Sequence, residues 1–220
     1  MQKIPLYMMP GMAASPKIFE LLRFPDIYEL HYMHWILPEQ NESLPSYVSR
    51  LNSLQIKHRN PILLGVSFGG IIVQEIAKQI SVRQLILIST VKNRNEFSPF
   101  FDKALRYKLY KLFPSRIMKQ VNLLEKIAFT KNLRKKMRLY KMYMTMHQPR
   151  YLNWAIEQIL QWEQEKNPDN FVHIVGENDR VFPPQYIQMP KIIVPKGRHD
   201  MILFKASWFN KNLPDLLVKD

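Results

Sequence analysis

The sequence predicts an α/β protein in which a mostly parallel sheet of about six strands is flanked by helices and interrupted by a helical insertion. Three observations support this fold class. Short apolar runs alternate with segments whose apolar residues recur at helical spacing. Most of these runs are continuous, which is typical of strands that are buried on both faces of a parallel sheet. Residues 92–166 contain no strand-like run and separate two such alternating regions.

The first region supplies four of the expected strands and two helices. The apolar runs that predict strands are residues 4–9, 27–33, 61–66 and 84–89. Apolar residues at helical spacing predict helices at residues 46–58 and 68–80. Strands that alternate with helices imply crossover connections, and therefore parallel pairing.

The insertion is rich in lysine, arginine, tyrosine, methionine and leucine at helical spacing. The helices expected there are residues 101–113, residues 133–147 and a third that begins at Pro149 and runs to about residue 165. Strands are expected again at 171–175 and 191–194, followed by a helix at 202–217. We therefore divide the chain into a core, residues 1–91 and 168–220, and a cap, residues 92–167.

The charge of the chain is strongly basic, with 32 lysines and arginines against 18 acidic residues and a formal net charge of +14. Such a balance raises the expectation of an anionic partner. Many of the basic residues lie within 101–141, where a solvated helical face explains them most simply. No aromatic–basic motif or glycine-rich phosphate loop is present, so we expect no nucleic-acid partner. Contact with an anionic membrane surface stays an alternative, and the oligomeric state is not predicted.

The absence of cysteine excludes a disulfide framework, a thiolate metal site and a cysteine nucleophile. The first ten residues lack a signal-peptide core, and no apolar run approaches the roughly 20 residues that span a bilayer. These features favour a cytoplasmic location.

Residues 65–69 read Gly-Val-Ser-Phe-Gly, a G-x-S-x-G sequence between an expected strand and an expected helix. A sharp turn at this junction raises the hydroxyl of Ser67 above the sheet edge, in a strained backbone conformation. Strand and helix crowd each other on either side of the serine, which explains Gly65 and Gly69. The alternative is that Ser67 is an ordinary helix N-cap.

A nucleophilic serine needs a base and a group that orients the base. His199 is the histidine that follows the last expected strand, and Gly197 is expected to let its loop turn back toward the serine. Asp179, after the preceding strand, is the expected acid, with Glu177 as the competitor. His31 and His34 are three apart in extended chain and point to opposite faces, so we expect no metal site there.

Acyl transfer also needs donors for the developing oxyanion. The expected donors are the backbone N–H groups of Phe68, after the nucleophile, and of Met12, after the first strand. Gly11 is expected to permit the turn at Met12. The chain has only six glycines, and all lie within three residues of a proposed catalytic group, so each is interpreted as a backbone requirement.

Four stretches together resemble the α/β-hydrolase superfamily, and in particular its compact esterase-like members with a Pro-Gly oxyanion loop. The stretches are MPGMA at 9–13, GVSFGG at 65–70, GENDRVFP at 176–183 and GRHDM at 197–201. The resemblance implies Ser67 as nucleophile, His199 as base and Asp179 as acid, without metal or cofactor. It also places the insertion where the family has its cap. Arg198 and Asp200 depart from the family pattern, and the Asp200 carboxylate could compete for the imidazole.

The function expected from these residues is a serine hydrolase that cleaves a small-molecule carboxylic ester or thioester through an acyl-enzyme. Its acyl pocket is expected to involve the methionines and aromatic residues of the cap, which could instead simply pack the cap against the core. These residues are Phe113, Met137, Tyr140, Met142, Tyr143, Met144, Met146 and Trp154. Two alternatives remain, a lyase-like enzyme with the same fold and a catalytically silent binding module.

Overall fold

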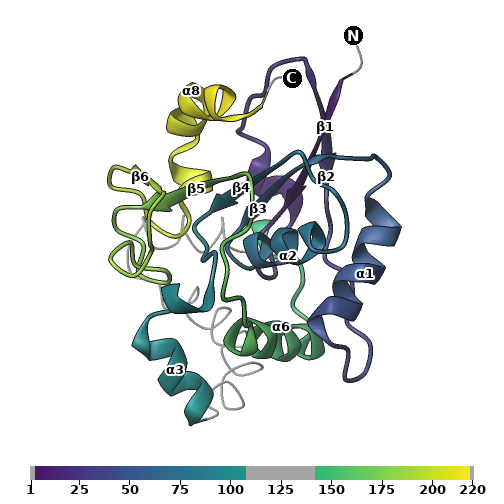
Figure 1. Ribbon diagram of the computed structural model, residues 1–220, viewed down its shortest axis with the longest axis vertical. Helices are drawn as coiled ribbons and strands as arrows, with labels where there is room; N and C mark the ends of the chain where they lie inside the picture. The colour runs from purple at the N-terminus through teal and green to yellow at the C-terminus, as the bar shows by residue number, and fades with distance from the viewer. Residues whose placement is uncertain (1–2, 108–141, 219–220) are drawn as a thin grey trace.

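The structure is a computed structural model that describes residues 3–107 and 142–218. Within these residues a six-stranded sheet lies between helices on both faces (Figure 1). The strand order is β2-β1-β3-β4-β5-β6, and the described strand pairs are all parallel. The predicted fold class is confirmed. The strands are β1 (Ile4–Met9), β2 (Tyr28–Tyr32), β3 (Ile62–Val66), β4 (Gln84–Ile88), β5 (Phe171–Gly176) and β6 (Ile192–Val194).

Helices connect the strands and cover the sheet. They are η1 (Pro16–Phe19), α1 (Leu44–Gln55), α2 (Phe68–Ala77), η2 (Arg94–Glu96), α3 (Pro99–Arg106), α6 (Pro149–Gln161), α7 (Met201–Phe204) and α8 (Ala206–Leu216). Between β4 and β5, the described residues contain helices and no regular strand, as the sequence predicts. Among the helices of the described residues, none combines the length and apolar character needed to cross a bilayer.

The core consists of two hydrophobic clusters, one on each face of the sheet. Side chains alternate between them along each strand, so Tyr7 and Met9 of β1 join one cluster while Leu6 and Met8 join the other. The first cluster includes residues of α1, α2 and α6, and the second includes residues of η1, α7 and α8. Figure 1 shows α6 next to α2. The described end of the insertion therefore shares a core with the sheet.

Several helix boundaries differ from the predictions by a few residues, and α2 (Phe68–Ala77), for example, ends before residue 80. α1 begins at Leu44, because Ser43 caps it by accepting a hydrogen bond from the Ser46 N–H. α6 ends at Gln161 rather than near residue 165. The expected helix at 202–217 is two helices, because Lys205 leaves the helical conformation with φ −123° and ψ 26°.

The helix predicted at 133–147 is wrong at its end. Its described part is helical only at 142–143, and Met144 then forms an antiparallel bridge with Ala14. The N–H groups of Thr145 and Met146 both donate to the carbonyl of Ala13 instead of continuing a helix. Residues 108–141, which include the rest of this prediction and the end of the one at 101–113, lie outside the described residues.

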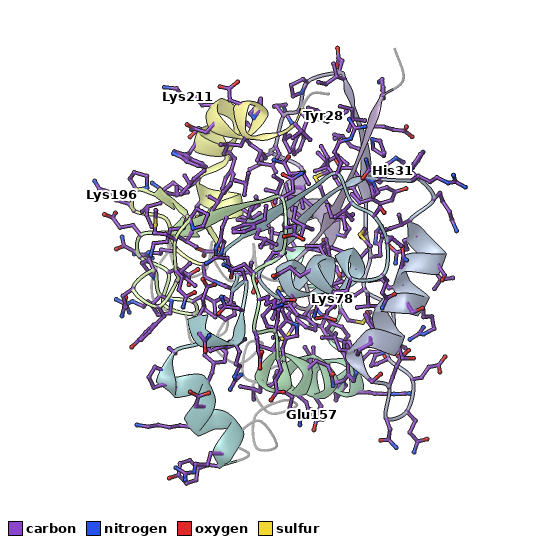
Figure 2. The ribbon with its side chains drawn as sticks, in the orientation of Figure 1. Tyr28, His31, Lys78, Glu157, Lys196 and Lys211 are labelled. Carbon is purple, nitrogen blue, oxygen red and sulfur yellow. The ribbon has the colours of Figure 1, made fainter. Side chains whose placement is uncertain are left out.

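Charged side chains lie mainly at the surface of the described residues. Lys196 and Lys211, for example, are exposed at the outer edge of the molecule (Figure 2). Most of the basic stretch at 101–141 lies outside the described residues, so its expected helical face stays a prediction.

Candidate active site

Ser67 lies between β3 and α2, in a backbone conformation that side chains rarely adopt. Its φ is 54° and its ψ is −122°. The Ser67 N–H donates to the carbonyl of Ile88 over 2.9 Å, and the Ser67 carbonyl accepts from the Gly70 N–H over 2.8 Å. These bonds tie the turn to β4 and to the first turn of α2. The turn also lies where the strand order reverses, between β1 and β3, which is where open parallel sheets bind their ligands.

Close backbone contacts surround this turn and require glycine. A Cβ on Gly65 would lie 2.4 Å from the carbonyl oxygen of Gly69. A Cβ on Gly69 would lie 2.4 Å from the carbonyl oxygen of Pro10. The predicted crowding on both sides of Ser67 is confirmed, and its source at Gly69 is the loop after β1.

His199 connects Ser67 to Asp179 by hydrogen bonds. Its Nε2 lies 2.9 Å from the Ser67 Oγ, and its Nδ1 lies 2.9 Å from Oδ2 and 3.2 Å from Oδ1 of Asp179. The Asp179 side chain is fully buried, and its Oδ1 also accepts from the N–H groups of Val181 and Phe182. The carboxylate is therefore fixed from two sides, and the imidazole is oriented with Nε2 toward the hydroxyl.

The other two carboxylates near the base have different surroundings. Glu177 accepts a hydrogen bond from the Lys196 N–H over 2.7 Å, so it braces the loop that carries His199. Among the described residues, no hydrogen bond or ion pair joins Asp200 to His199. Neither carboxylate takes the place of Asp179 beside the imidazole.

The loops that carry Asp179 and His199 approach each other through two glycines. A Cβ on Gly176 would lie 2.6 Å from the carbonyl oxygen of Gly197, which also accepts from the Asn178 N–H over 2.7 Å. All six glycines are described, and none has a positive φ. The positive φ angles in these two loops belong instead to Ala13 (63°) and Lys196 (55°), while Gly197 is needed for close packing.

The expected oxyanion donors are available in the structure. Neither the Phe68 N–H nor the Met12 N–H donates a hydrogen bond to a described residue. At Gly11, a Cβ would make an ordinary contact of 3.5 Å with the Cβ of Ser67, so glycine keeps the space beside the serine open.

Side chains distant in sequence hold the loop that carries Met12. The Trp35 Nε1–H donates to the carbonyl of Gly11 over 2.9 Å, and the Ala13 N–H donates to the Tyr151 hydroxyl over 3.2 Å. Burial raises the pKa of Tyr151 well above its usual value, so the hydroxyl keeps its proton. Sequence reasoning missed Trp35 and Tyr151, because nothing in their local sequence distinguishes them from ordinary core aromatics.

An aromatic wall lies behind the site. The ring of Phe68 stacks on Trp35 at a centroid distance of 5.2 Å, and Trp154 meets it edge-on at 6.0 Å. All three side chains are buried, so solvent does not reach the Phe68 ring. The wall belongs to the same hydrophobic cluster as α1, α2 and α6.

The residues expected to line an acyl pocket divide into three groups. Phe113, Met137 and Tyr140 lie outside the described residues. Met142 is exposed, and Met144 and Met146 are partly buried against the core. Tyr143 and Trp154 are buried and donate hydrogen bonds to Glu20 and to the carbonyl of Glu42. These two contacts favour packing over substrate binding.

His173 lies within β5, as predicted, and is a buried histidine outside the site. Its Nε2 lies 2.9 Å from the carbonyl oxygen of Thr90, and its Nδ1 is buried without a hydrogen-bond partner among the described residues. Burial lowers the pKa of His173 to about 4, so the ring is neutral at physiological pH.

Comparison with known proteins gives structural matches alone. No family model matches the chain, and no curated protein matches it. A putative non-heme bromoperoxidase, BpoC from Mycobacterium tuberculosis H37Rv, matches 98% of this chain and 92% of its own with 16% identity and a TM-score of 0.69. An alpha/beta hydrolase fold protein from Burkholderia ambifaria matches 97% and 91% with 18% identity and a TM-score of 0.65. A thermophilic esterase from Thermogutta terrifontis matches 97% and 89% with 13% identity and a TM-score of 0.62. At such identities the likeness shows the fold.

Proposed function

Given that the chain has the α/β-hydrolase fold, we propose that it is a serine hydrolase that cleaves a carboxylic ester or thioester through an acyl-enzyme. One observation carries this proposal. Continuous hydrogen bonds run from the Ser67 Oγ through both nitrogens of His199 to the buried carboxylate of Asp179. Because these groups come from the ends of three different strands, their meeting is a property of the fold rather than of local sequence.

In the first half of the proposed cycle, the Ser67 Oγ attacks the acyl carbonyl while His199 Nε2 takes the hydroxyl proton. The Asp179 carboxylate accepts from Nδ1–H and stabilises the imidazolium that forms. The N–H groups of Met12 and Phe68 donate to the oxyanion. Collapse of the tetrahedral intermediate breaks the bond to the alcohol or thiol, which leaves with the proton from Nε2.

In the second half, water attacks the acyl-enzyme, and Nε2 accepts one proton from it. The second tetrahedral intermediate collapses, and the proton returns to the Ser67 Oγ as the acid is released. The side chains of Ser67, His199 and Asp179 and the two backbone donors supply every step, so the proposed cycle calls on no metal or cofactor.

The proposed substrate is a small molecule, and the insertion at 92–167 is proposed as the cap that shapes its site. Support comes from the structural match to the Thermogutta esterase and from the position of α6, whose Tyr151 contacts the loop that carries Met12. The division into a core at 1–91 and 168–220 and a cap remains part of the proposal.

Labelling with a fluorophosphonate probe tests the proposed nucleophile. The wild-type chain should be labelled at Ser67 and should hydrolyse p-nitrophenyl esters of short acids, while Ser67→Ala should lose both properties and keep its circular dichroism spectrum. Labelling that persists in Ser67→Ala would refute the assignment. A panel of esters and thioesters with increasing acyl length would then define the acyl and leaving groups.

A further inference from the structure

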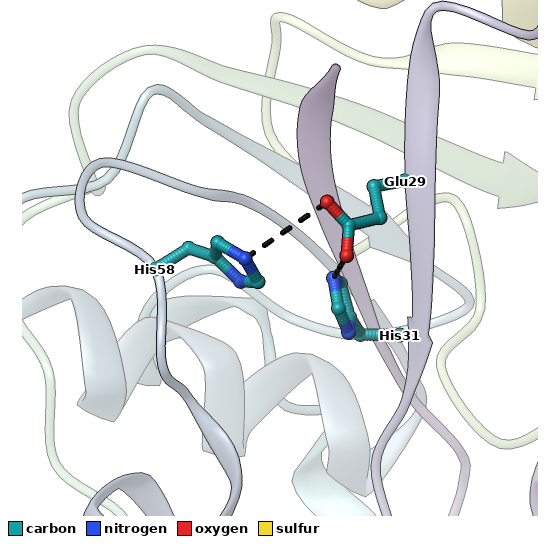
Figure 3. A group of neighbouring side chains, drawn as sticks. All are labelled: Glu29, His31 and His58. Carbon is teal, nitrogen blue, oxygen red and sulfur yellow. Dashed lines mark ion pairs between the residues drawn. The ribbon is translucent and has the colours of Figure 1, made fainter. Parts of the chain in front are cut away.

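A second group of imidazoles and a carboxylate lies away from the proposed active site. Glu29 and His31 are alternate residues of β2, so their side chains share one face of the sheet. His58 comes from the connection between α1 and β3, and Figure 3 shows the three side chains facing one another. Sequence reasoning considered His31 only with His34, which is not part of this group.

The two oxygens of Glu29 each face one imidazole. Oε1 lies 3.2 Å from the His31 Nε2, and Oε2 lies 3.9 Å from the His58 Nε2. One ligand atom from each of the three residues lies within 4.8 Å of the others. The His31 Nε2 is buried and makes no hydrogen bond of acceptable geometry with any described residue. Three donor atoms therefore lie close together, and the half-exposed Glu29 side chain connects the group to solvent.

Tyr7 orients both imidazoles. Its hydroxyl lies 2.7 Å from the His58 Nδ1 and accepts from the Lys57 N–H over 3.0 Å. Its ring stacks on the His31 ring with a centroid distance of 4.4 Å and an interplanar angle of 14°. His58 therefore has a hydrogen-bond partner on Nδ1, which is the usual arrangement in histidines that bind a metal through Nε2.

We propose that Glu29, His31 and His58 form a binding site for a divalent transition-metal ion of the Zn²⁺ class, with water in the remaining position. Two imidazole nitrogens and one carboxylate are a donor set that Zn²⁺ prefers. Bonds of about 2.1 Å in a tetrahedral complex place neighbouring donor atoms about 3.4 Å apart. The pair formed by Glu29 and His31 already has this spacing. The pair formed by Glu29 and His58, at 3.9 Å, would have to close by about 0.5 Å, which the half-exposed Glu29 side chain can supply while Tyr7 keeps its bond to His58.

Metal binding would join the edge strand of the sheet to the connection before β3. β2 pairs with β1 alone in the described sheet, so its other edge has no neighbouring strand. An ion held by β2 and by His58 binds the folded chain and not the unfolded one, and it therefore raises the thermal unfolding midpoint. This effect is independent of ester hydrolysis.

Titration of the full chain with Zn²⁺ alone, by calorimetry, tests the site. The wild type should bind one Zn²⁺ ion saturably and show a higher thermal unfolding midpoint when Zn²⁺ is bound. Co²⁺ at the same site should give the visible absorption bands of a four- or five-coordinate ion with nitrogen and oxygen ligands. Glu29→Gln and His58→Ala should each weaken Zn²⁺ binding at least tenfold. His34→Ala is the matched control, because it removes an exposed histidine three residues after His31 and beyond the end of β2, and it should bind as the wild type does.

Two results would overturn the inference. One is a wild-type chain without saturable Zn²⁺ binding. The other is wild-type affinity in both Glu29→Gln and His58→Ala, which would assign the ion to other side chains. Both substitutions change partly exposed side chains, and Glu29→Gln is isosteric, so folding can be checked in each by circular dichroism.

Discussion

Asp179 and Glu29 each contact imidazole, yet their surroundings differ in every other respect. The Asp179 carboxylate is 0% exposed, accepts two backbone N–H bonds and faces one imidazole, whose other nitrogen faces a hydroxyl. The Glu29 carboxylate is 47% exposed and is shared between two imidazoles. The same functional groups are thus proposed to transfer a proton in one region and to hold a cation in the other. The proposed difference depends on the burial of the carboxylate and on whether a hydroxyl or a second imidazole completes the group, and not on the residue types alone.

The largest expected effect is at the imidazole beside the proposed nucleophile. His199→Ala removes the proposed base, and we expect kcat/KM for an ester to fall about 10⁵-fold. His34→Ala, an exposed histidine outside both groups, should leave it unchanged. Steady-state kinetics with a p-nitrophenyl ester measures both. A loss below tenfold at His199 would remove the distinction between the two carboxylate–imidazole groups.

Asp179→Asn tests whether the buried carboxylate sets the tautomer of the base. The amide keeps an oxygen for the N–H groups of Val181 and Phe182, but it presents an NH₂ group to the imidazole, so the rate should fall about 10⁴-fold. Glu177→Gln is the matched control, because Glu177 bonds to the Lys196 N–H instead. A large loss in Glu177→Gln together with an active Asp179→Asn would reverse the assignment of the acid.

His173 extends the comparison to an imidazole that has no carboxylate partner among the described residues. Its pKa is lowered to about 4 in the folded chain, against about 6.5 when unfolded. The unfolded chain therefore binds the extra proton between these values, and the free energy of unfolding should decrease by about 3 kcal/mol as the pH falls from 6.5 to 4. In His173→Gln this contribution should disappear. Urea unfolding of both proteins across that range measures the difference, and parallel pH profiles would contradict it.

The smallest expected effect concerns the loop that carries Met12. Tyr151→Phe removes the hydroxyl that accepts from the Ala13 N–H, so kcat should fall about tenfold with little change in KM. Tyr47→Phe removes another buried hydroxyl, which bonds to Ile36, and serves as the matched control. Equal losses of kcat in the two variants would mean that general packing, and not the position of the Met12 N–H, is responsible.

The strands could be predicted from sequence because they depend on local signals, and the proposed site residues could then be located by their positions after those strands. Runs such as 61–66 are buried on both faces, so hydrophobicity alone marks them to within a residue or two. The turn at Ser67 could be predicted from Gly65 and Gly69, because the close backbone contacts at these positions leave no room for a side chain. The structure brings Ser67, Asp179 and His199 together, and their roles stay a prediction until measured.

Contacts between distant residues could not be predicted in this way. Tyr151 is 138 residues from Ala13, and Trp35 is 24 residues from Gly11, so no local pattern joins them. His58 meets Glu29 only because the connection between α1 and β3 passes close to β1, where His58 bonds to Tyr7 and faces the Glu29 carboxylate. The wrong helix end near residue 147 has the same origin, since backbone bonds to Ala13 replace the bonds of a helix.

The bonds around Ala13 define where this molecule could be recombined with foreign sequence. The described supports of the loop after β1 are Trp35, residues 143–146 and Tyr151, and all lie outside the stretch between 107 and 142. A chimera that exchanges that stretch would retain each of those supports. The proposed role of the cap predicts that selectivity for acyl groups changes with the exchanged segment, while the described bonds around Ala13 are kept.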